Sequence, residues 1–110
     1  MNITNLSKQE QENWKLYKIP HQTDMHRVKI NVINLSTANS REHELKKCEL
    51  AFDFMKSGDK IITEAEQISN GLKRDLVNIS TGEIYEIENS KMERSKRHPS
   101  NINVIYYDKK

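Results

Sequence analysis

The stretch Arg41–Lys56, REHELKKCELAFDFMK, decides the fold, because it is the clearest helix in the chain and strands are predicted after it. Ser40 is a suitable N-cap, and acidic residues in the first turn suit the positive end of the helix dipole. Gly58 is able to end the helix in a left-handed conformation. The apolar residues recur at intervals of three and four: Leu45, Cys48, Ala51, Phe52 and Met55. This spacing predicts an amphipathic helix that buries that stripe. It also predicts that Leu50 and Phe54 face outward.

The residues after this helix predict a sheet. Short strands are expected at Lys60–Glu64, Lys73–Ile79 and Glu83–Glu88, and the tight turn Ser80-Thr81-Gly82 makes the last two a hairpin. A polar segment at Asn89–Arg97 predicts a short helix, and a final strand follows at Asn101–Tyr107. The expected order is helix, three strands, helix, strand. The predicted fold class is therefore α/β (α+β), with a mixed sheet flanked by helices.

Before Arg41 the pattern is weaker. Residues 1–13 are polar and without periodicity, which is typical of a loose arm or a marginal helix that Trp14 and Tyr17 would hold to the body. The segment His26–Leu35 alternates apolar residues on one face at Val28, Ile30 and Val32, which predicts a strand. We therefore expect a polar N-terminal extension at residues 1–25 and one domain at residues 26–110.

Composition limits the function classes. The chain has 110 residues, of which 35% are hydrophobic, so one domain with a small core is expected. No apolar run approaches a membrane span, and the first residues resemble no secretory signal, so we expect no membrane partner and a cytoplasmic location. The single Cys48 excludes an internal disulfide and a cysteine-based zinc site.

Charge is distributed unevenly along the chain. Residues 1–41 carry +3, residues 42–88 carry −5 and residues 89–110 carry +4, for a net charge of +2. An acidic centre with basic flanks suits a metal-dependent enzyme that acts on a polyanion, because carboxylates hold cations and Lys or Arg neutralise phosphates. The alternative is an ordinary solvated surface.

Glu44 projects into the apolar stripe of the helix, close to Cys48 and Ala51. Carboxylates are almost never buried without a partner or a metal. Glu44 is therefore a candidate ligand. The alternatives are that it lies at the edge of the stripe, caps the helix or pairs with Lys47.

Three further carboxylates are predicted on the hairpin. Glu86 and Glu88 share one face of their strand, and Asp75 lies on the neighbouring strand, so the three side chains are expected to converge. A divalent cation such as Mg²⁺ would relieve their mutual repulsion. The alternative is an acidic, solvent-facing sheet edge that prevents edge pairing.

The pattern E44-x(30)-D75-x(10)-E86-I-E88, on the order α-β-β-β-α-β, resembles the PD-(D/E)XK nuclease superfamily. Within it, the chain is most similar to small Holliday-junction-resolvase-like and viral or archaeal nucleases. The resemblance covers roughly residues 41–107. It implies a restriction-endonuclease-like core and metal-dependent hydrolysis of DNA phosphodiester bonds by Mg²⁺ or Mn²⁺ and an activated water. The DNA would be branched or single-stranded, and a viral protein would work in the host cytoplasm.

The resemblance also implies roles for residues. Asp75 would be the central metal ligand, Glu86 the second, and Glu44 a helix-borne ligand that acts directly or through water. Glu88 stands where the family usually has Lys, so it would orient or deprotonate the attacking water or hold a second metal. Lys47 or Lys73 would supply the missing positive charge.

Basic residues are expected to bind the DNA backbone without reading bases. Lys47, Lys73 and Arg74 belong to this set, and Arg74 stands where the family often has proline. The C-terminal members are Lys91, Arg94, Lys96 and Arg97. For these last four, the alternative is a solvated helix face.

A second cluster of potential ligands is His21-x-x-Asp24-x-His26. Two His and a carboxylate suit Fe, Zn or Mn, but Pro20 makes the local backbone irregular and no other region supplies a matching motif. DNA contact is favoured for this region, through His21, His26, Arg27 and Lys29.

Two alternatives to a nuclease remain open. Glu88 in place of Lys suits a non-catalytic nucleic-acid-binding module of the same fold. The polar N-terminal residues and Trp14 suit a protein-interaction or regulatory protein. For an enzyme that must grip a duplex, a chain this small favours a homodimer, with Leu50 and Phe54 as candidate contacts with a second subunit or with the N-terminal segment.

Overall fold

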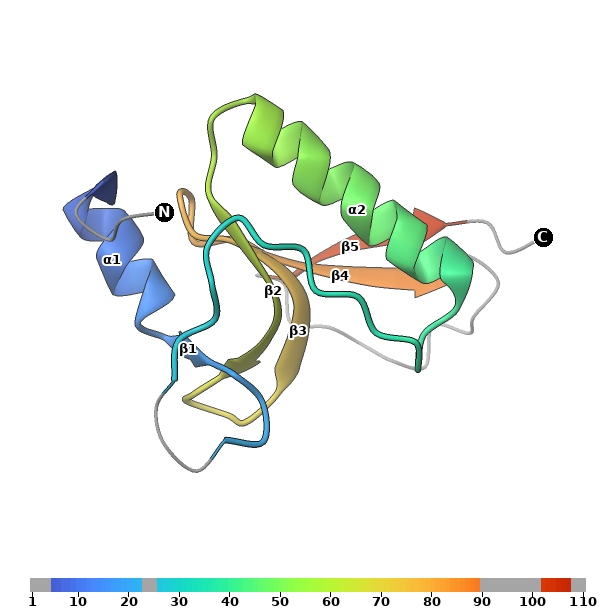
Figure 1. Ribbon diagram of the computed structural model, residues 1–110, viewed down its shortest axis with the longest axis horizontal. Helices are drawn as coiled ribbons and strands as arrows, with labels where there is room; N and C mark the ends of the chain where they lie inside the picture. Colours follow the sequence, from blue (N-terminus) through green and yellow to red (C-terminus); the bar gives the residue numbers. More distant parts are fainter. Residues whose placement is uncertain (1–4, 23–25, 90–101, 108–110) are drawn as a thin grey trace.

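A sheet of five strands organises the chain, with one helix across it and one beside it (Figure 1). The computed structural model describes residues 5–22, 26–89 and 102–107. The helices are α1 (Lys8–Trp14) and α2 (Arg41–Lys56). The strands are β1 (Tyr17–Lys18), β2 (Ile61–Gln67), β3 (Lys73–Asn78), β4 (Ile84–Asn89) and β5 (Ile102–Tyr107). The fold is thus a compact α+β domain.

The strands lie in the order β1-β2-β3-β4-β5, so each one neighbours the next in the sequence. The first four pair antiparallel, and β4 and β5 pair parallel. In the β3–β4 hairpin, Leu76 faces Tyr85 and Val77 faces Ile84. The hairpin predicted at Ser80–Gly82 is confirmed, and Gly82 takes the positive φ of 85° that the turn needs.

Helix α2 has the bounds that the sequence predicts. The Ser40 side chain accepts a hydrogen bond from the backbone N–H of His43, and Gly58 follows the C-cap with a φ of 92°. The helix packs over a small apolar cluster on one face of the sheet. This cluster consists of Ala51, Ile61 and Leu76, with Ile33, Leu50, Phe54 and Tyr85 packed against it.

The predicted apolar stripe of α2 is wrong in phase. Leu45, Phe52 and Met55 are exposed, whereas Leu50 and Phe54 pack on the sheet. The buried residues of the helix are His43, Glu44, Lys47 and Ala51. Three polar residues take the place of apolar ones because they find partners on the sheet, in the segment before the helix and in one another, which the helix sequence alone does not reveal.

A larger apolar cluster lies apart from α2. It consists of Leu6, Tyr17, Val28, Ile62, Ala65, Val77, Ile79, Ile84 and Ile102, with Trp14 and Ile30 packed against it. Trp14 also donates its indole N–H to the Val28 carbonyl at 2.8 Å. The segment before α2 is therefore part of the core of this domain.

The strand predicted at His26–Leu35 is absent from the structure, and this prediction is wrong. The segment is irregular, and Asn31 has a φ of 60°, which lies outside the extended conformation of regular strands. Asn31 hydrogen-bonds to the backbone N–H of Ile61 through its side chain and to the Ile61 carbonyl through its own N–H. Val28 is buried and Ile30 is packed on the core, so their alternation reflects burial of a loop.

The helix predicted at Asn89–Arg97 falls almost wholly outside the described residues, and Asn89 itself ends β4. In the ranges 5–22, 26–89 and 102–107, neither helix has the length and apolar character needed to cross a bilayer.

Candidate functional site

The first turns of α2 direct three polar side chains toward the sheet. His43 and Glu44 are each 8% exposed and Lys47 is fully buried. The helix begins after the Ser40 cap, and positions 43, 44 and 47 differ by one and four, so the helical period brings all three side chains to the inner face. Burial of a histidine, a carboxylate and an ammonium side by side requires that each be paired.

Glu44 is paired on both carboxylate oxygens. Its Oε1 accepts from the Ser36 amide at 2.6 Å and lies 2.7 Å from the Lys47 ammonium. Its Oε2 accepts from the Asn39 amide group at 3.1 Å and lies 2.6 Å from His43 Nδ1. Burial raises the pKa of Glu44, but the bonds from Lys47, Ser36 and His43 outweigh it and lower the pKa to about 2. The pairing of Glu44 with Lys47 is therefore confirmed.

Lys47 connects α2 to β2. Its ammonium lies 3.1 Å from Glu64 Oε2, and the other oxygen of Glu64 lies 3.1 Å from Lys73 Nζ. Glu64 has a φ of 50° in the middle of β2. This backbone turn breaks the rule that successive side chains of a strand point to opposite faces of the sheet. Lys73, in contrast, leaves nearly half of its side chain exposed.

The β3–β4 pairing opens beyond Leu76 and Tyr85, and two carboxylates fill the opening. The Ile87 N–H donates to Asp75 Oδ2 at 2.8 Å, and the Asp75 N–H donates to Glu86 Oε2 at 3.4 Å. Side-chain oxygens thus replace backbone carbonyls as acceptors where the two strands separate.

Glu86 is buried beside Asp75, and Arg74 is its cationic partner among the described residues. Arg74 Nη1 donates to Glu86 Oε1 at 3.2 Å. Burial and the Asp75 carboxylate raise the pKa of Glu86 to about 7, although the Arg74 bond opposes this shift. Near neutral pH, Glu86 therefore exchanges a proton readily.

His43 joins the two halves of the site. Its Nε2 lies 3.3 Å from Asp75 Oδ2, while Nδ1 faces Glu44. Tyr107 on β5 meets the imidazole edge-on, and its hydroxyl hydrogen-bonds with Ser40 at 3.1 Å. We name the connected set the polar cluster: His43, Glu44, Lys47, Glu64, Asp75 and Glu86.

The structure thus connects Glu44, Asp75 and Glu86 in one network, in which His43 stands between Glu44 and Asp75. Glu88 lies two residues farther along β4, half-buried and opposite Tyr106 on β5. Lys47 and Arg74 are buried against carboxylates, a position that neutralises acids instead of presenting a cation to DNA. The predicted backbone-binding residues at positions 91, 94, 96 and 97 lie outside the described residues.

Two members of the cluster were missed by sequence reasoning, His43 and Glu64. His43 is adjacent to Glu44, and a histidine next to a predicted ligand was a signal that could have identified it. Glu64 gave no signal, because its role depends on a backbone turn inside β2.

The carboxylates have the chemistry of Mg²⁺ or Mn²⁺ ligands, because hard cations prefer oxygen donors. Within the part of the chain that the structure describes, no group of three or more His, Cys, Asp and Glu is arranged to hold a metal ion. The cluster oxygens instead accept from protein donors.

Comparison with known proteins gives no match to a family model, to a curated protein or to a solved structure.

Proposed function

We propose that the protein is a metal-dependent nuclease with a restriction-endonuclease-like core, and that the polar cluster is its active site. The observation that carries this proposal is the junction of Asp75 and Glu86 where β3 and β4 separate, with Glu44 connected to it through His43. The sheet supports it as well, since a helix precedes three antiparallel strands and the last strand is parallel to its neighbour.

Asp75 and Glu86 would hold Mg²⁺ or Mn²⁺, and Glu44, on the other side of the His43 ring, would act through water. The ion would supply charge neutralisation for the phosphate and would lower the pKa of a bound water. The chain contributes the proton transfers. His43 lies between the Glu44 and Asp75 carboxylates, which fix the orientation of its ring. Glu86, whose pKa is raised to about 7, is the group that would take up a proton at neutral pH.

Lys73 is the basic residue best placed to meet a phosphate, because its side chain is half-exposed beside Glu64. DNA as the partner and an intracellular location belong to the same proposal. The same proposal includes Glu88, which stands where the PD-(D/E)XK superfamily usually has Lys.

The test is hydrolysis of single-stranded, duplex and four-way-junction DNA in Mg²⁺ and in Mn²⁺, with chelator as the blank. We expect cleavage by the wild type, its loss in Asp75→Asn, and normal cleavage by Glu49→Gln, a matched change on the exposed side of α2. No cleavage with either metal, or full cleavage by Asp75→Asn, contradicts the proposal.

A second candidate function is DNA binding without hydrolysis. It is favoured by the protein donors that already satisfy Glu44, Asp75 and Glu86, since ordered hydrogen bonds leave these oxygens less available to a cation. This function predicts salt-dependent DNA binding that is unchanged by Mg²⁺ and by Asp75→Asn.

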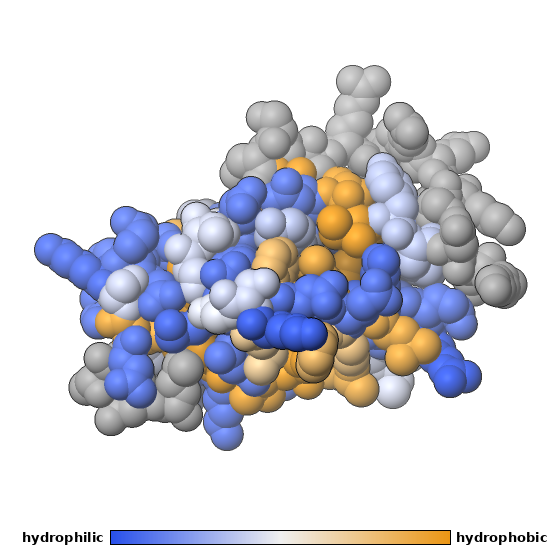
Figure 2. All heavy atoms as spheres, turned by 90° about the horizontal axis from the view of Figure 1, so that it is seen from above, coloured by the Kyte–Doolittle hydropathy of each residue, from blue (hydrophilic) through white to orange (hydrophobic). Residues whose placement is uncertain are grey.

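We also propose that two copies associate through the outward side of α2. The apolar residues exposed there are Leu45, Phe52 and Met55. Figure 2 views the molecule from above relative to Figure 1 and shows hydrophobic residues interspersed among hydrophilic ones. Glu42 and Lys56 stand two heptads apart, so antiparallel pairing of two α2 helices would bring opposite charges together.

A further inference from the structure

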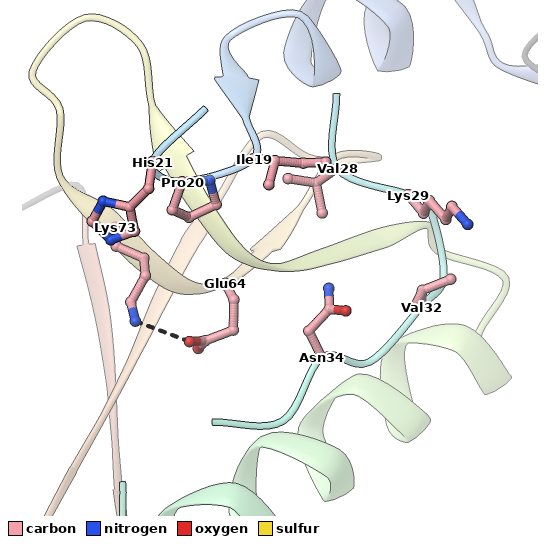
Figure 3. A pocket seen from close by; sticks show the side chains of 9 residues that line it. All are labelled: Ile19, Pro20, His21, Val28, Lys29, Val32, Asn34, Glu64 and Lys73. Atoms are coloured by element: carbon pink, nitrogen blue, oxygen red, sulfur yellow. Dashed lines mark ion pairs between the residues drawn. The ribbon is translucent and has the colours of Figure 1, made fainter. Parts of the chain in front are cut away.

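A cavity of about 480 Å³ lies beside the polar cluster. Three segments form it: the end of the β1 loop, the irregular segment before α2, and the facing parts of β2 and β3 (Figure 3). Its lining residues are Ile19, Pro20, His21, Val28, Lys29, Val32, Asn34, Glu64 and Lys73.

The cavity has apolar walls and a polar side. Ile19, Val28 and Val32 provide aliphatic surface, whereas His21 and Lys73 lie together on one side of the opening in Figure 3. This combination fits a flat, largely apolar ring that carries an anionic group. A nucleobase with its phosphate has that chemistry.

The backbone around the cavity is held in an unusual conformation. Among the described residues, the non-glycine residues with positive φ are His21, Asn31 and Glu64. His21 and Glu64 line the cavity, and Asn31 lies in the segment that carries Lys29 and Val32. Such conformations persist only where the surroundings fix them, and they concentrate at ligand sites.

The cavity and the polar cluster share Glu64. One of its oxygens binds Lys47 inside the cluster, and the other binds Lys73 at the cavity. The cavity therefore adjoins the polar cluster at Glu64, and Lys73 stands at their boundary.

We propose that this cavity binds one unstacked base of single-stranded DNA, with Lys73 against the adjoining phosphate. The inference rests on the proposed function, because it assigns the substrate of the same site. It explains why the cavity and the half-exposed Lys73 lie next to the buried polar cluster.

The probe is a single-stranded oligothymidylate that contains one 2-aminopurine, measured in chelator so that no hydrolysis occurs. Removal of the fluorescent base from its neighbours changes its emission, so binding in the cavity gives a fluorescence change. The test variant is Val32→Trp, which fills the cavity from a partly exposed position. The matched control is Leu35→Trp, the same change three residues farther along, outside the lining.

We expect the emission change with the wild type and with Leu35→Trp, and about tenfold weaker binding with Val32→Trp. As a second pair, Lys73→Ala weakens binding and Lys56→Ala does not. Equal affinities across either pair, or no emission change with the wild type, overturn the inference.

The two proposals fail separately. Cleavage of DNA by a protein that gives no emission change overturns the base pocket and leaves the nuclease proposal intact. An emission change that depends on Val32, from a protein that cleaves nothing, supports the pocket and contradicts the nuclease.

Discussion

At the scale of single residues, Lys47 determines how the charges of the site balance. It is fully buried, and it is the ammonium shared by Glu44 and Glu64. Removal of one member of a buried ion network leaves the others uncompensated, which costs far more than the network's net contribution.

The first prediction is that Lys47→Met lowers the free energy of unfolding by about 3–5 kcal/mol. Lys46→Met, the neighbouring change on the wetter side of the helix, is expected to stay within about 0.5 kcal/mol of the wild type. Urea unfolding of both variants checks this. Similar midpoints for the two would show that the buried ammonium contributes no more than a surface one.

Glu86 gives the second prediction, a stability that falls as the pH rises from about 5 to 7. Its pKa is about 7 in the folded protein and near 4.5 in the unfolded chain, so the folded state binds more protons in this interval. Glu44 does not interfere, because its lowered pKa keeps it ionised there in the folded protein.

Glu86→Gln places a neutral group at this position, so its stability is expected to be nearly level between pH 5 and 7. Glu49→Gln on the surface of α2 should keep the slope of the wild type. Thermal unfolding in chelator at several pH values measures the slopes. Parallel curves for wild type and Glu86→Gln would rule out a raised pKa at this residue.

At the scale of elements, one carboxylate of α1 both caps the helix and joins it to the sheet side of the domain. Glu10 completes a capping box with Ser7, and its other oxygen accepts from Ser80 at 2.6 Å and faces Lys60 at 3.3 Å. The bond from Ser80, followed by that from the Ser7 amide, lowers the pKa of Glu10 to about 2. A seven-residue helix is too short to be stable without such anchors.

The third prediction is that Glu10→Gln costs about 1–2 kcal/mol of stability at pH 7. The folded-state pKa is below the unfolded one, so this contribution is present above about pH 4.5 and is lost as the pH falls toward 2. Wild type and variant should therefore converge in acid. Urea titrations at pH 7 and in acid measure the difference in stability, with Glu12→Gln on the exposed side of α1 as the control. A stability difference between wild type and Glu10→Gln that does not change with pH would contradict this assignment.

Elements with local signals could be predicted from sequence. The Ser40 cap and Gly58 set the ends of α2, and the Ser80–Gly82 turn set the hairpin, because caps and turns depend on neighbouring residues. The segment around Asn31 failed because an alternating pattern of valine and isoleucine also arises when a loop covers a core.

The candidate site divides in the same way. Asp75 and Glu86 could be placed together, since a hairpin fixes which residues face each other. The burial of Lys47 and Glu64 could not be foreseen, because each depends on the other across separate elements. Because Lys and Glu are usually exposed, the sequence predicted a surface position for both residues.

At the scale of the whole molecule, the sheet is covered unequally. The N-terminal segment contributes Leu6, Trp14 and Tyr17 to the larger apolar cluster, whereas α2 covers the smaller one and buries polar residues beside it. The helix that carries the proposed catalytic groups therefore buries polar residues beside Ala51, Leu50 and Phe54, and it turns other apolar residues outward: Leu45, Phe52 and Met55.

The last prediction concerns that outward side of α2. Phe52 is 61% exposed, and we expect it to lie at the centre of a two-fold contact, where burial of aromatic surface drives association. The wild type should sediment as a dimer at micromolar concentration, and Phe52→Glu as a monomer. Leu72→Glu places the same charge on a similarly exposed residue between β2 and β3, and it should leave the dimer intact. A monomeric wild type would contradict this two-fold contact. The outward side of α2 would then need a different partner to cover it.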